Sequence, residues 1–401
     1  MLVSRRSSAY PEGLLKDFNE AAGRRFPQSD WLLRSIAGPF RREGARVWYN
    51  VGMRAKIVRS IFLVAIAAAA LQLHATPPAF AKGADLSWVT ELESRGFRWS
   101  STAGEEMECF ALMKSIGFNA VRLRVWVDPQ DGWNSGEDLA NKARRAAKLK
   151  LPVMLDFHYS DTWADPGKQF KPARWAGLDR AALLKEIGEH TAKVLKEVKA
   201  TGAEIAWVQV GNEVRPGLLW DANAELSGAL YDVKSGGRTI AAANRANFAA
   251  FLDAGAKAVR RSCPRAKIIV HCDHGDKWGD LAGVLDAAKK VDYDIFGVSL
   301  YPKEDWGPAV KACAENLARV KREYGKTTMV CEFGMPTHPF DPARDATSAL
   351  LSAMRRTKGC SGVFYWEPES FPEAHGYKLG ACTAKGMTVT PSPALAPFAA
   401  N

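Results

Sequence analysis

Short apolar runs alternate with amphipathic segments along the chain from Lys82 onward. Eight of these runs are predicted to be strands, because most of them are continuously apolar, as strands buried on both faces are. The expected strands are Ala84–Trp88, Ala120–Trp126, Val153–His158, Ala206–Asn212, Lys267–Cys272, Asp294–Leu300, Thr328–Glu332 and Gly362–Trp366.

The segments between the strands carry apolar residues at helical spacing. One stripe runs through Cys109, Leu112 and Ile116, and the stretch 102–105 before it has the capping-box pattern that opens a helix. Eight strands with crossover helices in about 320 residues predict an α/β fold, a (β/α)8 TIM barrel that forms a single catalytic domain. The alternative is an open doubly wound sheet, but no glycine-rich nucleotide motif follows any strand.

A secretory signal peptide is predicted at residues 53–81. A basic stretch starts at Met53, an apolar run of 13 residues spans Ile61–Leu73, and Ala79 and Ala81 fit the small-residue cleavage rule. Residues 1–52 are then expected to be a non-native or disordered extension, and 82–401 the barrel domain. We therefore expect an exported protein, periplasmic or extracellular, with no membrane attachment after cleavage. The one linker-like stretch is the Pro/Ala-rich tail after Thr388.

The net charge of +11 first suggests an anionic partner. Residues 1–60, however, hold twelve Lys and Arg against five Asp and Glu, so most of the excess precedes the barrel and a nucleic-acid partner is not expected. Several of the thirteen Trp residues are at strand ends or in polar loops, where such rings stack on sugars or bases, but Trp also fills cores, and composition alone leaves both interpretations open.

Polar and aromatic side chains gather where the predicted strands end. A barrel enzyme has its site at this edge, so these residues are expected to meet in one place. They are Asp85, Trp88, Arg122, Arg124, Trp126, Asp156, His158, Asn212, Glu213, His271, Asp273, Tyr301, Glu332, Trp366 and Glu367.

Two carboxylates stand out among them. Glu213 follows the fourth strand and Glu332 ends the seventh, and these strand ends face each other across a barrel mouth. Hydrolysis of a glycosidic bond needs one carboxyl that protonates the leaving oxygen and one that acts as nucleophile or activates water. The distance between the two decides between retention and inversion, which the residue pattern by itself leaves open.

The chain resembles the arabinogalactan endo-β-1,4-galactanase family, glycoside hydrolase family 53, from Lys82 to about Phe398. The segments that carry the resemblance are Gly83-Ala-Asp-Leu-Ser-Trp88, Val121-Arg-Leu-Arg-Val-Trp-Val-Asp-Pro129, Asp156-Phe-His-Tyr-Ser-Asp-Thr-Trp-Ala-Asp-Pro-Gly-Lys168, Trp207-Val-Gln-Val-Gly-Asn-Glu213, Ser299-Leu-Tyr-Pro302, Glu332-Phe-Gly-Met-Pro336 and Gly362-Val-Phe-Tyr-Trp-Glu-Pro368. The resemblance implies endo-hydrolysis of β-1,4-galactan by a retaining double displacement.

The resemblance also implies roles for individual residues. Glu213 matches the acid/base and Glu332 the nucleophile. Asn212 would bind the 2-hydroxyl of the sugar that is cleaved, and Arg124 would keep Glu332 ionised. Tyr301 would either hold Glu332 in position or simply pack before Pro302.

Further substrate contacts are expected around the catalytic pair. Trp366 would form the floor of the cleavage subsite and Trp163 would stack on a neighbouring galactose, while Asp85 is counted among the substrate contacts. Asp161 or Asp165 would bind hydroxyls, although Asp165 could instead stiffen its loop. His158 is expected to be an orienting hydrogen-bond donor.

No cofactor and no metal are expected, because two carboxyls suffice for the chemistry. The stretch 334–345 has no closely spaced run of oxygen ligands, so no calcium is expected there. Cys331 is expected to point away from Glu332, towards the helices, by strand alternation. The expected partner is a β-1,4-galactan polysaccharide and the expected state a monomer. The alternatives are another retaining barrel endo-glycanase, such as a β-mannanase or β-glucanase, and a non-catalytic sugar-binding barrel.

Overall fold

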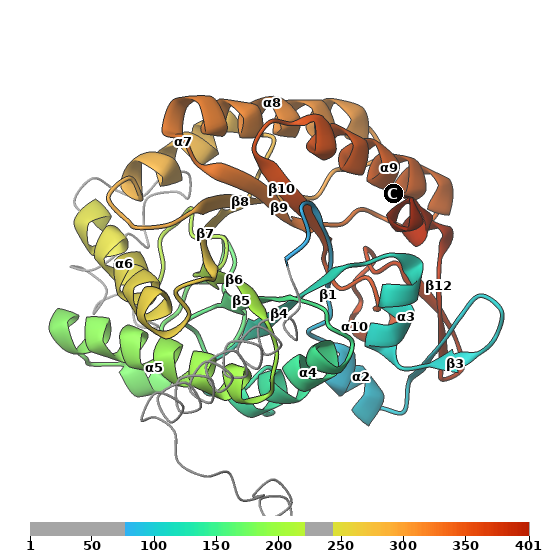
Figure 1. Ribbon diagram of the computed structural model, residues 1–401, viewed down its shortest axis with the longest axis horizontal. Helices are drawn as coiled ribbons and strands as arrows, with labels where there is room; N and C mark the ends of the chain where they lie inside the picture. The colour runs from blue at the N-terminus through green and yellow to red at the C-terminus, as the bar shows by residue number, and fades with distance from the viewer. Residues whose placement is uncertain (1–76, 221–243, 401) are drawn as a thin grey trace, which may run out of the picture. The chain divides into compact units, whose positions relative to one another are not determined.

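The computed structural model describes residues 77–220 and 244–400 of the chain. Within this part, eight parallel strands close into a barrel in the order β1-β10-β9-β8-β7-β6-β5-β4 (Figure 1). Their bounds are β1 Ala81–Asp85, β4 Ala120–Val125, β5 Val153–Phe157, β6 Ile205–Val210, β7 Lys267–Cys272, β8 Ile295–Leu300, β9 Thr327–Phe333 and β10 Cys360–Tyr365. The predicted (β/α)8 barrel is therefore confirmed, and the open sheet is excluded.

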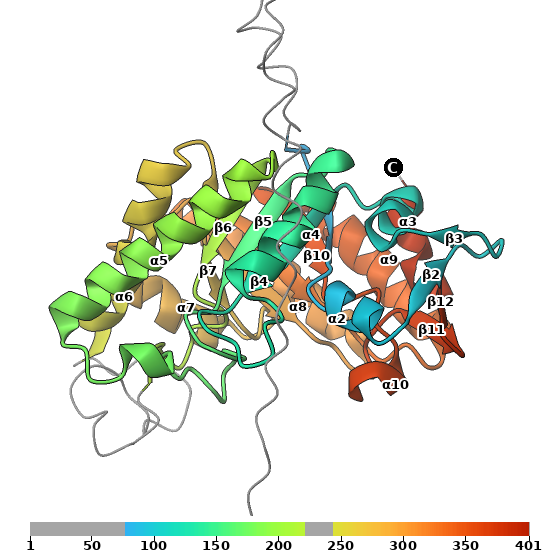
Figure 2. The same ribbon diagram turned by 90° about the horizontal axis from the view of Figure 1, so that it is seen from below.

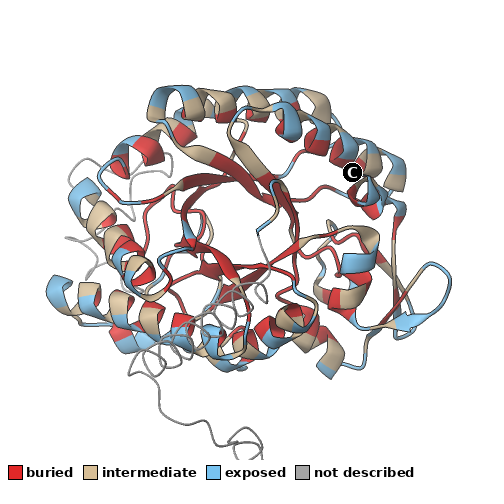
Figure 3. Ribbon diagram, in the orientation of Figure 1, coloured by how far each residue is buried: buried red, intermediate tan, exposed pale blue. Residues whose placement is uncertain are grey.

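Helices surround the barrel and cover its outer face (Figures 1 and 2). The α-helices are α2 Val89–Ser94, α3 Cys109–Ile116, α4 Gly136–Lys148, α5 Arg180–Ala200, α6 Arg245–Ser262, α7 Trp278–Ala287, α8 Trp306–Tyr324, α9 Phe340–Arg356 and α10 Pro372–His375, with short 3-10 helices at Ala173–Trp175 and Pro393–Ala399. Figure 3 shows buried residues on the strands and on the inward sides of the helices, as amphipathic helices require. No helix of the described residues is long and apolar enough to span a membrane.

The core has two layers because successive strand residues point to opposite faces. One buried cluster joins the strands to the helices, and a smaller one contains only strand residues that face the barrel interior: Ala81, Ala120, Met154, Ala206, Trp207, Ile269, Ile295, Met329, Cys331 and Phe364. Gly83 belongs to the same interior, since a Cβ at this position would overlap the ring of Phe364.

The prediction for Cys331 was wrong. Val298 pairs with Val330, but the next residue of β8, Ser299, pairs with Glu332, so β9 contains a bulge at Cys331. Met329 and Cys331 both lie in the interior cluster, as residues two apart on a strand do, and the extra residue lets Glu332 pair with Ser299 and line the cavity as well. The thiol therefore lies beside Gly297 instead of facing the helices. A bulge depends on pairing with the neighbouring strand, which the local pattern does not reveal.

A small second sheet, not expected from the sequence, lies at the side of the barrel beside α3 (Figure 1). Its order is β11-β12-β2-β3, with β2 Arg98–Ser100, β3 Glu106–Met107, β11 Cys382–Lys385 and β12 Thr388–Pro391. The capping-box stretch at 102–105 lies in the β2–β3 turn, where the Ser101 hydroxyl accepts the backbone N–H groups of Ala103 and Glu105. Helix α3 begins later, at Cys109, and its cap is the Glu108 carboxylate.

The tail after Thr388 is part of the fold and not a linker. It forms β12 and the 3-10 helix Pro393–Ala399, in which Phe398 is fully buried and stacks on Phe118 with ring centroids 4.1 Å apart. The Lys82 ammonium donates to the Phe398 carbonyl oxygen at 2.7 Å, which ties this tail to β1. The predicted signal peptide and the extension before it lie outside the described residues, apart from residues 77–81.

Candidate active site

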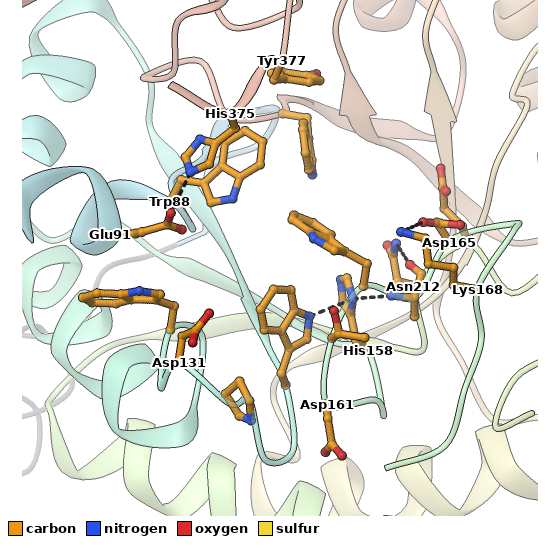
Figure 4. Close-up of a pocket in the computed structure, with 18 of the residues that line it drawn as sticks. Trp88, Glu91, Asp131, His158, Asp161, Asp165, Lys168, Asn212, His375 and Tyr377 are labelled. Atoms are coloured by element: carbon orange, nitrogen blue, oxygen red, sulfur yellow. Dashed lines mark hydrogen bonds and ion pairs between the residues drawn. The ribbon is translucent and has the colours of Figure 1, made fainter. Parts of the chain in front are cut away.

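A cavity of about 1180 Å³ opens at the carboxyl ends of the barrel strands. It brings together most of the predicted site residues, which come from β5, β6, β8, β9, β10 and the loops that follow them (Figure 4). The predicted residues that line it are His158, Asp161, Trp163, Asn212, Glu213, Tyr301, Glu332 and Trp366. Asp85 and Arg124 do not line the cavity; both are buried beneath it.

Glu213 follows β6 in a constrained backbone position. Its φ of 46° lies in the left-handed region that non-glycine residues rarely adopt, and such strain is typical of functional sites. The Gln169 amide holds this turn by donating to the Asn212 carbonyl oxygen at 2.8 Å and to that of Glu213 at 3.3 Å. Burial, and then the nearby Glu332, raise the pKa of Glu213 well above its usual value. A raised pKa favours the protonated form of the carboxyl, which is the form that a general acid needs.

Glu332 on β9 has the opposite environment. The Arg122 guanidinium lies 2.8 Å from its Oε1, and the Tyr301 hydroxyl donates to its Oε2 at 2.7 Å. A cation and a hydroxyl donor both stabilise an ionised carboxylate. Burial opposes the charge of Arg122, but Asp156, Glu332 and Asp85 together raise its pKa well above its usual value. The two candidate carboxyls therefore have different surroundings: Glu213 is buried beside another carboxyl, whereas Glu332 is bonded to a cation and a hydroxyl donor.

The predicted pairing of Arg124 with Glu332 was wrong. Arg124 pairs with Glu367 at the end of β10, and it is Arg122 that reaches Glu332. The two arginines lie two residues apart on β4 and so face the same side of the sheet. Their depth along the strand decides which one meets the nucleophile candidate, and the strand pattern did not distinguish them.

Arg124 organises an aromatic wall instead. Its guanidinium lies 4.3 Å from the ring centroid of Trp163 and within 6.0 Å of those of Trp88, Trp126 and Trp366. The indoles also contact one another, with centroids 5.0 Å apart for Trp88 and Trp366 and 5.2 Å apart for Trp126 and Trp163. The four rings line the cavity and present the flat apolar faces on which sugar rings stack.

A polar network beneath the cavity orients Asn212. Its Nδ2 donates to the Ala164 carbonyl oxygen at 2.8 Å, and its Oδ1 accepts from Arg122 at 3.0 Å and from Gln209 at 2.9 Å. These contacts fix which end of the amide is the acceptor. The neighbour of Glu213 is thus held rigidly at the cavity wall.

His158 is also fixed by its partners. Its Nδ1 accepts from the Trp126 indole at 3.2 Å and from the Ala164 backbone at 3.0 Å, so Nε2 carries the hydrogen that bonds to Asp156 at 3.0 Å. The ring is held in place by these contacts, and its hydrogen goes to a buried carboxylate.

The two aspartates of the β5 loop are engaged with the backbone. Both carboxylate oxygens of Asp161 accept backbone N–H groups, from Asp128 at 3.0 Å and from Ala173 at 2.8 Å. Asp165 accepts the N–H of Gly167 at 2.7 Å, which is the contact expected if Asp165 stiffens its loop. Both residues line the cavity, where their carboxylates shape the wall.

Several lining residues were not predicted. Glu91 on α2 bonds to His375 at 2.9 Å, and the His375 ring stacks on Trp88 with centroids 4.2 Å apart (Figure 4). Asp131 and Trp133 line the cavity from the loop after β4. Glu91 and His375 lie on helices and not at the ends of barrel strands, so a search limited to strand ends could not find them. Ser299 belongs to the family segment 299–302 but was assigned no role from the sequence, yet its hydroxyl lies between the two carboxylates.

Comparison with known proteins shows the family of this chain. The profile of glycosyl hydrolase family 53 matches residues 81–350. A probable arabinogalactan endo-β-1,4-galactanase A of Neosartorya fischeri is 30% identical over 77% of this chain and 88% of its own length. An endo-β-1,4-galactanase of Bacillus subtilis is 30% identical over 73% of this chain and 71% of its own length.

Solved structures agree with the sequence relatives. A fungal β-1,4-galactanase superimposes with a TM-score of 0.68 at 26% identity, covering 79% of this chain and 98% of its own. The family 53 catalytic domain of Ignisphaera aggregans gives a TM-score of 0.67 at 25% identity, covering 80% and 96%. The chain belongs to glycosyl hydrolase family 53.

Proposed function

We propose that this glycoside hydrolase cleaves internal β-1,4-galactosidic bonds of galactan, as in type I arabinogalactan, with Glu213 as acid/base and Glu332 as nucleophile. The single observation that carries the assignment of roles is the contrast between the two carboxyls. Glu213 is buried with a raised pKa, whereas Glu332 is bonded to Arg122 and Tyr301. The substrate class rests on the family and on the galactanases among its relatives.

The spacing of the carboxyls supports retention. The Ser299 hydroxyl oxygen lies 2.6 Å from Glu213 Oε1 and 3.4 Å from Glu332 Oε2, so those two oxygens are at most about 6 Å apart. Retaining enzymes separate their carboxyls by about 5–5.5 Å, and inverting enzymes by about 6.5–9.5 Å to make room for a water molecule.

The reaction then proceeds in two displacements. Glu332 attacks the anomeric carbon while the bond to the leaving oxygen breaks and the proton of Glu213 passes to that oxygen. Water next attacks the same carbon, gives its proton back to Glu213 and releases Glu332 from the sugar. Asn212, held by Ala164 and Gln209, would bind the sugar 2-hydroxyl, and Trp366 and Trp163 would support the sugar rings.

Carboxamide variants test the assignment. Glu213→Gln and Glu332→Gln should each lower kcat on galactan at least about 1,000-fold with little change in melting temperature, since each keeps the shape of the side chain. Glu304→Gln, an exposed residue of the loop after β8, is the matched control and should keep full activity. Near wild-type turnover in either active-site variant would overturn the assignment.

A substrate panel tests the specificity. Galactan, β-mannan and β-glucan are assayed for released reducing ends, and NMR follows the anomer of the first product. We expect activity on galactan with a first-formed β-anomer. Faster release from mannan or glucan would identify a different endo-glycanase, tight galactan binding without release a sugar-binding barrel, and an α-anomer an inverting mechanism.

We also propose that the protein is exported and acts as a monomer without a cofactor. Support for export comes from the predicted signal peptide at 53–81, most of which lies outside the described residues. Ala81 is the last residue of the predicted signal peptide and also the first residue of β1, where it is buried and pairs with Gly362 of β10. N-terminal sequencing of the native protein tests the cleavage site: a mature chain should start close to Lys82, and a retained residue 53 would contradict the proposal.

A further inference from the structure

Ser299 at the end of β8 contacts both candidate catalytic carboxyls. Its side chain is 1% exposed, and its hydroxyl oxygen lies 2.6 Å from Glu213 Oε1, 3.0 Å from His271 Nε2 and 3.4 Å from Glu332 Oε2. No other described side chain is hydrogen-bonded to a carboxylate oxygen of Glu213. A hydroxyl has one hydrogen to donate, so these contacts cannot all be made in the same direction.

The direction of the His271 contact follows from the backbone of Glu213. The backbone N–H of Glu213 donates to His271 Nδ1 at 3.3 Å. Asn212 Oδ1 lies 2.9 Å from the same Nδ1 atom but already accepts from Arg122 and Gln209, so Nδ1 is the acceptor nitrogen of the ring. Burial, and then the charge of Arg122, lower the pKa of His271 to about 3, so the ring is neutral and has a single hydrogen. The single hydrogen of His271 is consequently on Nε2, which donates to the Ser299 oxygen at 3.0 Å.

This assignment determines the remaining bond. Because its oxygen accepts from His271, the Ser299 hydroxyl keeps its own hydrogen for a carboxylate, and it donates to Glu213 Oε1 when Glu213 is ionised. When Glu213 is protonated, the acid can donate to the Ser299 oxygen, and the Ser299 hydrogen can turn to Glu332 Oε2 at 3.4 Å instead. A charge-assisted bond of this kind is about twice as strong as a neutral one, so the hydroxyl stabilises the ionised form more.

We propose that Ser299 is a positioning residue whose hydroxyl changes partner with the charge of Glu213. It accepts from the protonated acid while its own hydrogen is directed at Glu332, and it donates to the Glu213 carboxylate after the proton has passed to the leaving oxygen. The inference rests on the proposed function, because it needs Glu213 to cycle between the two forms. Ser299 thereby sets how readily Glu213 gives up its proton and later works as a base.

Other titratable groups also face Glu213, and their positions do not depend on Ser299. The charged ones are Glu332 on β9, Asp273 after β7 and Asp165 in the loop after β5, and the phenol of Tyr301 after β8 is neutral. Asp273 is paired with Arg215 and Asp165 with Lys168. Since these pairs stay in place when a hydroxyl is removed from Ser299, a change in the pH profile can be attributed to that hydroxyl.

The test compares kcat/KM for galactan against pH in wild type, Ser299→Ala and Tyr301→Phe. Ser299→Ala removes a donor from ionised Glu213, so the pKa of Glu213 rises and the basic limb of the profile moves up by about one pH unit, with the acidic limb unchanged. Tyr301→Phe removes a hydroxyl that is bonded to Glu332 and not to Glu213, so it is the comparison variant and should leave the basic limb in place. Melting temperatures verify that both variants fold.

A Ser299→Ala profile that superimposes on the wild-type profile, or that shifts only on the acidic side, would overturn the role of Ser299. The acid/base assignment is tested separately with Glu213→Ala, an aryl β-galactoside with an activated leaving group and added azide. Rescue with formation of a β-glycosyl azide supports Glu213 as acid/base whatever Ser299 does. Absence of rescue in a folded variant would reject the proposed function itself.

Discussion

Two arginines of β4 show how much of this site is decided at the level of single residues. Arg122 contacts Asp85, Asp156 and Glu332, whereas Arg124 contacts Glu367 and the tryptophan wall. Both are 1% exposed, so both charges depend on their partners. Their effects on activity should nevertheless differ, because only one of them touches the proposed nucleophile.

Lysine substitutions separate the two roles. Arg122→Lys keeps a positive charge but cannot hold three carboxylates in the same geometry, so kcat should fall about 100-fold, which corresponds to about 2.7 kcal/mol of transition-state stabilisation. Arg124→Lys should raise KM and change kcat by less than about threefold, because it loosens the packing of the tryptophan wall and does not change any contact of Glu332. Steady-state kinetics on galactan measure both, and the reverse ranking of the kcat effects would contradict the observed pairing.

At the scale of elements, the register between neighbouring strands controls what the barrel interior contains. The bulge in β9 lets Cys331 and Glu332 both face inward, with Cys331 next to Gly297, and β10 places Phe364 against Gly83 of β1. The two glycines leave the room that these side chains occupy. The strands were recognised from their apolar runs, whereas the glycines carried no visible signal, because their role depends on a residue more than thirty positions away.

Gly83→Ala tests this packing. The added methyl group would overlap the Phe364 ring, so the free energy of unfolding should fall by about 1–3 kcal/mol, as in other overpacked cores. Gly279→Ala is the matched control, because a methyl group on this exposed glycine of α7 would meet no other atom within 4 Å and the change should stabilise by up to about 1 kcal/mol. Urea denaturation measures both, and equal stability of Gly83→Ala and wild type would argue against the observed interior.

At the scale of the described chain, distant segments close the barrel and its side sheet. The β2–β3 hairpin, which follows β1, pairs with the β11–β12 hairpin near the carboxyl terminus, and the final 3-10 helix packs on α9. Phe398 in this last turn stacks on Phe118 and accepts a hydrogen bond from Lys82. A tail that composition alone suggests to be a linker is thus part of the core.

Removal of the Phe398 ring should therefore be costly. Phe398→Ala is expected to reduce the free energy of unfolding by about 3–5 kcal/mol, the range for deletion of a fully buried aromatic side chain. Met387→Ala in the β11–β12 turn, where the side chain is 57% exposed, should change it by less than about 0.5 kcal/mol. Thermal or urea unfolding monitored by circular dichroism distinguishes the two, and a neutral Phe398→Ala would show that the tail does not contribute to the fold.

The sequence by itself determined the class of fold and the gathering of chemistry at one edge. Continuous apolar runs indicate buried strands, whichever strands they pair with. Because parallel strands of a barrel end at the same edge, Glu213 and Glu332 lie at that edge. The family segments then narrowed the chemistry to glycoside hydrolysis.

Only the tertiary structure decided which side chains serve that pair. The contact of Arg122 with Glu332, the position of Ser299 between the carboxyls and the approach of α10 to Trp88 join residues far apart in the sequence. Such contacts depend on strand register, on a bulge and on depth along a strand. The local pattern of apolar and polar residues encodes the face on which a side chain lies, but not the partner it meets there.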